Sequence, residues 1–122
     1  MSMFPFLGGY GTRAETFTVD LSGYSAYGSR LGPGTVISNL IAIYPAGGTP
    51  PYTYEVGYVS GAGALITQSG NTVKFSDFID LIPVTRNSVY SITVTDANGA
   101  TGTVASVPVT LETYLNDGGM IP

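Results

Sequence analysis

Apolar and hydroxyl-bearing side chains alternate strictly over residues 90–95, which is the clearest pattern in the chain. An aromatic or aliphatic residue stands at each even position, and a serine or threonine at each odd one. This period of two predicts a strand with one buried and one solvated face. The turn-forming sequence Asp96-Ala97-Asn98-Gly99 follows directly and reverses a chain at low cost. We therefore expect a hairpin whose second strand begins at Ala100.

Similar patterns predict the other strands. Apolar and polar residues alternate over 16–21 and 52–59, and a nearly continuous apolar run predicts one central strand over 35–44. Two shorter strands are expected over 61–66 and 71–75, and a last long strand over 100–111.

Local signals modify this picture at two places. In the last strand the apolar parity changes near Ala105-Ser106, which predicts a β-bulge. Pro108 predicts that this strand lies at a sheet edge, because proline has no N–H to donate to a neighbour. Over residues 76–86 we expect a helical turn instead, which Asp77 can cap and Pro83 ends.

Short strands with turn signals about every ten residues and no long helical period are typical of an antiparallel two-sheet sandwich. We expect this all-β sandwich to occupy residues 35–111. Residues 1–34 are rich in Gly and Tyr and predict an extended arm that carries one early strand. Residues 112–122 predict a loose C-terminal tail.

The composition argues against several classes of function. Charged residues make up 10% of the chain, the net charge is -4, and the cations at positions 13, 30, 74 and 86 are scattered. Such a chain forms no basic footprint, so we expect no nucleic acid as partner. No apolar run reaches the roughly 20 residues of a spanning helix, so we expect no membrane partner either. The first residues lack the pattern of a secretory signal, which predicts a protein made without the usual export route.

No group of reactive residues is favoured over a structural explanation. The chain has no His and no Cys, which are the commonest general base and thiol nucleophile. Lys74 and Ser76 share a strand face, but a solvated lysine keeps its proton. Asp77, Asp80 and Asp96 offer ligands for a hard cation, although helix capping explains Asp77 better. We expect no enzyme, no catalytic residue, no cofactor and no metal.

Two longer motifs resemble a known family. Gly47–Tyr54 reads GGTPPYTY and Tyr90–Gly99 reads YSITVTDANG, and both resemble elements of the bacterial immunoglobulin-like repeats related to PKD and SprB-type domains. The likeness covers about residues 35–111, although Glu55–Tyr58 stands where such repeats carry a tryptophan. The resemblance implies an antiparallel immunoglobulin-like two-sheet sandwich, here with extended N- and C-terminal arms. It also implies a tyrosine-corner role for Tyr90, whose hydroxyl would bond backbone upstream.

The same resemblance indicates a role without chemistry, because such domains serve as spacers and adhesion modules and similar folds occur on tailed-phage particles. We expect a structural protein of a phage virion, a capsid-decoration or tail and connector accessory subunit. It would dock through its arms and sheet edges onto other virion structural proteins or its own copies, since weakly charged, tyrosine-rich surfaces suit such contacts. The expected partner-binding residues are aromatic and apolar residues of the two arms: Phe4, Phe6, Tyr10, Tyr24, Tyr27, Tyr114 and Met120.

The alternative is a surface-adhesion or carbohydrate-binding immunoglobulin-like module on the bacterial cell surface. In it, Tyr52, Tyr54 and Tyr58 would offer stacking faces to sugar rings. The period of two favours a different interpretation, in which these side chains face the core.

Overall fold

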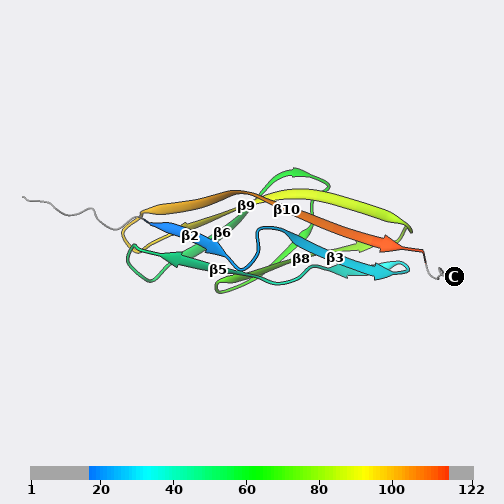
Figure 1. The fold of residues 1–122 in the computed structure, drawn as a ribbon, viewed down its shortest axis with the longest axis horizontal. Helices are drawn as coiled ribbons and strands as arrows, with labels where there is room; N and C mark the ends of the chain where they lie inside the picture. Colours follow the sequence, from blue (N-terminus) through cyan, green and yellow to red (C-terminus); the bar gives the residue numbers. More distant parts are fainter. Residues whose placement is uncertain (1–16, 116–122) are drawn as a thin grey trace, which may run out of the picture.

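The computed structural model describes residues 17–115, which form an all-β fold (Figure 1). The strands of this described part are β2 (Thr18–Leu21), β3 (Ala26–Leu31), β4 (Gly34–Ile37), β5 (Ile41–Ala46), β6 (Thr53–Gly61), β7 (Leu65–Ser69), β8 (Thr72–Ile79), β9 (Val84–Thr95) and β10 (Thr101–Tyr114).

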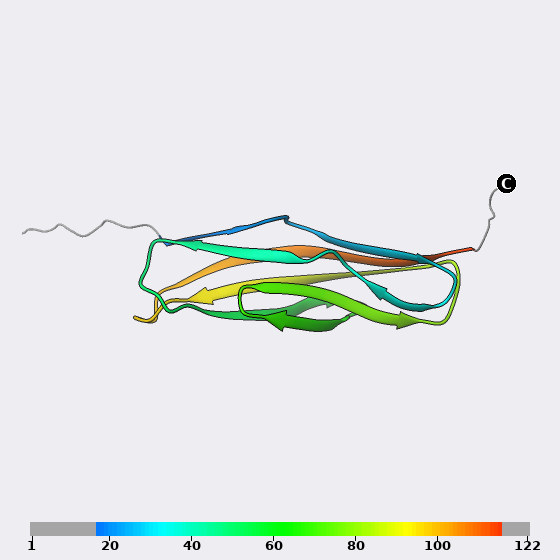
Figure 2. The same ribbon diagram turned by 90° about the horizontal axis from the view of Figure 1, so that it is seen from below.

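The strands form two sheets that pack face to face. One sheet has the order β3-β10-β9-β6; the other has the order β2-β5-β8-β4, with β7 also paired to β8. Figure 1 views the sandwich from its side, with β9 and β10 in one layer and β5 and β8 in the other; Figure 2 shows the strands running along its length. The order agrees with the immunoglobulin arrangement, in which β5, β8 and β7 take the places of strands B, E and D and β6, β9 and β10 those of C, F and G. The predicted all-β two-sheet sandwich is thus confirmed for the described residues, although its β3–β10 pair is parallel rather than antiparallel as predicted.

The first two strands divide between the sheets. β2 pairs antiparallel with β5, whereas β3 crosses over and pairs parallel with β10. The sequence predicted only one strand before residue 35, so β3 is a correction, and the expected boundary at 34/35 falls inside β4. The buried positions of β3 are Ala26 and Gly28, which are too small to produce an apolar pattern. Likewise β10 continues through Tyr114, so residues 112–114 belong to the sandwich.

The predicted central strand over 35–44 is interrupted. Ser38 is buried between β4 and β5, and its hydroxyl accepts a hydrogen bond from the Phe75 N–H at 2.9 Å. Asn39 turns toward β3: its N–H donates to the Tyr27 carbonyl at 3.2 Å, and its Oδ1 accepts from the Tyr27 N–H at 2.8 Å. Asn39 therefore hydrogen-bonds the backbone N–H and carbonyl of Tyr27 at the outer edge of β3, where a further strand would otherwise pair.

The helical turn predicted over 76–86 is wrong, because β8 continues to Ile79 and β9 begins at Val84. Asp77 caps no helix. It lies on the same side of β8 as the buried Val73 and Phe75, and its Oδ2 accepts a hydrogen bond from Arg86 of β9 at 2.7 Å. This ion pair joins the two sheets. Asp77 takes an inward position in β8, and its charge interrupts the alternation of apolar residues that would otherwise have predicted a strand there.

The last strand confirms one prediction and corrects another. The pairing of β10 with β9 shifts register between Val104 and Val107, which is the predicted bulge. Pro108 does not mark an edge strand, since β10 lies between β9 and β3. However, the pairing with β3 starts only at Val109, so no ladder partner stands beside Pro108 on that side. The missing N–H is tolerated there.

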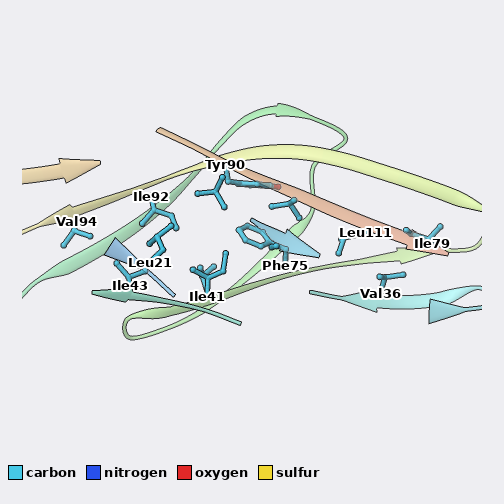
Figure 3. Close-up of a cluster of buried hydrophobic side chains, with 14 residues drawn as sticks. Leu21, Val36, Ile41, Ile43, Phe75, Ile79, Tyr90, Ile92, Val94 and Leu111 are labelled. Atoms are coloured by element: carbon cyan, nitrogen blue, oxygen red, sulfur yellow. The ribbon is translucent and has the colours of Figure 1, made fainter. Parts of the chain in front are cut away.

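The core lies between the two sheets and is built mainly from alternate residues of β8, β9 and β10 (Figure 3). The rings of Phe75 and Tyr90 meet at its centre, with ring centroids 4.7 Å apart. The largest fully buried side chains are Tyr90, Phe75, Ile41, Ile43, Ile79, Ile92, Leu111, Val36, Val73, Val94, Val107 and Val109.

The Tyr90 hydroxyl ties the core to the connection before β7. It accepts a hydrogen bond from the Ala64 N–H at 2.7 Å and donates to the Ala64 carbonyl at 3.1 Å. The expected bond to backbone upstream is therefore present, although it spans 26 residues. Together with the bond from the Gly63 N–H to Ser88 Oγ, it holds the connection in place, so β7 begins at Leu65 rather than at residue 61 as predicted.

Replacing Tyr90 with Phe should lower the free energy of unfolding by about 1–3 kcal/mol, because both backbone groups of Ala64 lose their partner in a half-buried site. Tyr58→Phe is the matched control, because that hydroxyl donates to the Gly61 carbonyl at an exposed position. Its effect should stay within about 0.5 kcal/mol. Urea denaturation measures both, and equal losses in the two variants would contradict the assignment.

Candidate docking surface

The two motifs that carry the family resemblance meet at one end of the sandwich. GGTPP forms the connection between β5 and β6, and DANG forms the turn between β9 and β10. Asp96 joins them: its Oδ2 accepts a hydrogen bond from the Thr49 N–H at 2.9 Å, and its Oδ1 accepts from the N–H groups of Asn98 at 2.9 Å and Ala100 at 2.8 Å. The Ala97 N–H donates back to the Thr49 carbonyl at 2.8 Å. We call this arrangement the motif junction.

The motif junction explains the chemistry of Asp96. Hydrogen bonds from backbone N–H groups, first that of Thr49, hold the pKa of the Asp96 carboxyl below its ordinary value of 3.8. Asp96 is 8% exposed, and both of its carboxylate oxygens accept hydrogen bonds from backbone N–H groups. Its role in the described structure is to fasten one loop to another.

The structure does not bring the three candidate cation ligands together. Asp77 pairs with Arg86 near the start of β9, Asp96 follows the end of that strand, and Asp80 is exposed in the β8–β9 connection. Over residues 17–115, no group of three or more acidic, His or Cys side chains is placed to hold a metal ion, and no pocket is found. Lys74 and Ser76 lie on the outer face of β8, as predicted. Within the same residues, no helix is long and apolar enough to cross a membrane.

Two of the predicted partner-binding residues form a pair on the outer face of the four-stranded sheet. The hydroxyls of Tyr27 and Tyr114 lie 2.7 Å apart, although the residues are separated by 87 positions in the chain. Parallel pairing of β3 with β10 brings them together. The two side chains are 47% and 42% exposed, so their rings remain available to a partner. We call them the tyrosine pair.

Glu112 and Thr85 complete the polar surroundings of the tyrosine pair. The Thr85 hydroxyl donates to the Glu112 carboxylate at 3.2 Å. Hydrogen bonding with Tyr27, and then with Tyr114, holds the pKa of Glu112 below its ordinary value. The bond with Tyr27 likewise raises the pKa of Tyr114 above its ordinary value. The bond between the two hydroxyls holds the tyrosine side chains together before any partner arrives, which lowers the entropy cost of binding.

The other predicted partner-binding residues do not join this pair. Tyr24 is exposed, but its hydroxyl accepts from the Leu21 N–H at 3.2 Å and donates to Asp20 at 3.0 Å, so it closes a local turn. The remaining four lie outside the described residues: Phe4, Phe6, Tyr10 and Met120.

The three tyrosines expected to face the core or to bind sugar do not share one environment. Tyr52 and Tyr54 pack partly buried against the core, as the period of two predicted. Tyr58 is 59% exposed, and its ring makes a T-shaped contact with that of Tyr90, with centroids 5.8 Å apart. A register shift between Tyr58 and Ser60 in the β6–β9 pairing accompanies this difference. The three rings therefore form no continuous stacking surface.

Sequence reasoning missed an apolar patch on the outer face of the five-stranded sheet. Ile37, Leu65 and Phe78 are 53%, 68% and 63% exposed. Ile37 and Leu65 pair with Ser76 from the two sides of β8, and Phe78 is two residues further along β8. A signal was present, because Val36-Ile37 places apolar side chains on both faces of one strand. We call these three residues the outer patch.

Comparison with known proteins adds no further identification: no family model matches the chain, and no curated protein matches it.

Proposed function

We propose that the protein is a non-enzymatic structural subunit that docks onto other proteins of a larger assembly through exposed aromatic and aliphatic side chains. The tyrosine pair carries this proposal. It offers two large rings on adjacent strands, held by hydrogen bonds to each other and by the polar groups beside them. Tyrosines that lose little side-chain entropy are typical of the residues that dominate protein interfaces.

The rest of the described surface supports the same role. Thirteen large apolar or aromatic side chains between residues 17 and 115 are at least 42% exposed, whereas charged residues make up 10% of the whole chain. Exposed apolar surface rimmed by polar residues is typical of protein contact sites.

The setting that we propose is a phage virion, with the chain as a capsid-decoration or tail accessory subunit. Its support is the resemblance of the GGTPPYTY and TVTDANG motifs to immunoglobulin-like repeats, and the aromatic residues that the sequence places before the sandwich. The alternative setting is the bacterial cell surface. A sugar-binding role there has less support, because Tyr52 and Tyr54 turn toward the core.

The tyrosine pair can be tested by particle association. The tagged full chain is produced in cells that assemble particles, and its copies per purified particle are counted. We expect the double variant Tyr27→Ala/Tyr114→Ala to be retained about tenfold less than the unchanged chain, because interface tyrosines are typical hot spots. Its melting temperature should change little, since both side chains are exposed.

Tyr44→Ala is the control, because Tyr44 is 54% exposed on the other sheet. Equal retention of the double variant and the control would reject the tyrosine pair as the docking site. Recovery of the unchanged chain in the cell envelope, with none on particles, would favour the alternative setting.

A further inference from the structure

The outer patch is compact and lies on three neighbouring strands. Ser76 of β8 stands at its middle, with Ile37 of β4 and Leu65 of β7 opposite it on the two sides. Phe78 lies one step further on the same face of β8. Strands are about 4.8 Å apart and a two-residue step is about 6.7 Å, so the patch measures roughly 10 by 7 Å.

This size selects the kind of occupant. A stable contact between two globular surfaces buries about 800 Å² on each partner, which is several times the area of such a patch. Three exposed side chains instead fit a short segment that inserts two or three residues. The occupant is therefore a peptide stretch rather than a second folded face.

The chain itself contains a segment with matching chemistry. Residues 1–12 carry no charged side chain, and Phe4 and Phe6 are separated by one residue. In an extended chain, alternate side chains project to the same side about 6.7 Å apart, which matches the step from Ser76 to Phe78. Pro5 between them has no N–H to add to a sheet edge, so the segment suits a sheet face better than a strand ladder. In the C-terminal residues, Met120 and Ile121 are adjacent and would project to opposite sides.

The position of the segment favours a second copy over the same molecule. β2 starts at Thr18, opposite Ala46, and the patch residue Ile37 is nine positions before Ala46 along β4 and β5. That distance is about 30 Å, whereas the twelve steps from Phe6 to Thr18 span at most about 40 Å. β2 begins opposite Ala46 and runs toward the patch, so the residues before β2 leave it in the opposite direction. To reach the patch of the same molecule, they would have to turn back and then extend almost fully. A neighbouring copy imposes no such reversal.

We propose that Phe4 and Phe6 of one copy pack onto the patch of Ile37, Leu65 and Phe78 of a second copy. This inference rests on the proposed function as an assembly subunit, and it makes the chain its own partner. The segment with Phe4 and Phe6 and the outer patch are different surfaces of the chain, so the contact is heterologous. It can continue from copy to copy as a ring or a filament.

Sedimentation of the full chain over a range of concentrations tests this contact. We expect oligomers for the unchanged chain. Association should be at least about tenfold weaker for the segment variant Phe4→Ser/Phe6→Ser, and equally for the patch variant Leu65→Thr/Phe78→Ser. Mixed together, these two variants should form one-to-one dimers and nothing larger, because one intact segment and one intact patch remain. Tyr44→Ser, which changes an exposed residue of β5 outside the patch, should associate like the unchanged chain.

Disulfide trapping identifies the segment that binds the outer patch. The chain has no Cys, so only the introduced cysteines can form a disulfide. Phe6→Cys together with Leu65→Cys should give a ladder of linked copies on a non-reducing gel. A link within a single copy, or a ladder only when Met120→Cys replaces Phe6→Cys, would overturn the proposal. So would a chain that stays monomeric at every concentration, and that outcome leaves the particle-association test of the tyrosine pair intact.

Discussion

Gly28→Ala should destabilise the protein by about 3 kcal/mol or more, because the added methyl group would overlap backbone atoms. Gly28 lies buried in β3, where the chain passes close to β4. A Cβ at this position would lie 2.4 Å from the Ile37 carbonyl oxygen and 2.7 Å from its carbon. Both are backbone atoms, so no side-chain rotation relieves the overlap, and β3 and β4 must separate.

Gly23→Ala is the matched control, because its nearest neighbour would be the Ser25 carbonyl oxygen at an ordinary 3.9 Å. We expect that change to stay within about 0.5 kcal/mol. Thermal unfolding separates the two, since a loss of 3 kcal/mol corresponds to a fall of roughly 10 °C for a domain of this size. A Gly28→Ala variant as stable as the control would show that β3 does not pack against β4 as described.

The strength of the sequence signal follows the size of the buried side chains. β9 was predictable because large apolar residues alternate with small polar ones over 90–95. β3 was not, because its buried positions are Ala26 and Gly28. The close approach that requires glycine is a tertiary contact, and no pattern within the strand reports it.

A charged residue, Asp77, likewise prevented the prediction of the second half of β8. Asp77 has a structural partner, Arg86, on the other sheet, and an aspartate before Phe78 has the appearance of a helix cap when that partner is unknown. Whether Asp77 caps a helix or lies in a strand depends on its ion pair with Arg86 across the sandwich. A local sequence pattern does not show which charged side chains pair between the two sheets.

The sequence singled out Tyr27 and Tyr114 individually but not their contact, and the outer patch was missed. Tyr27 and Tyr114 follow from composition and position, whereas their contact depends on the parallel pairing of β3 with β10, which no local pattern predicts. The outer patch needs three strands in register, so its members are scattered at 37, 65 and 78.

Asp96→Asn should lower the melting temperature at neutral pH by several degrees, because the motif junction depends on a carboxylate with two accepting oxygens. An amide keeps one acceptor and turns an NH2 group toward backbone N–H donors, either that of Thr49 or those of Asn98 and Ala100. At least one donor then loses its partner and faces another donor. The connection between β5 and β6 loses its attachment to the β9–β10 turn.

The effect should depend on pH with a definite sign. The pKa of Asp96 is lower in the folded protein than its ordinary value of 3.8, so its contribution to stability is complete above that value. As the pH falls from 3.8 through the lowered folded pKa, the unfolded chain binds the proton first, and the contribution disappears. The gap in melting temperature between the unchanged chain and Asp96→Asn should therefore be widest at neutral pH and narrow in acid. Asp80→Asn removes the same charge at an exposed position and should show no such gap. A gap that stays constant from neutral pH into acid would show that the charge of Asp96 does not hold the junction together.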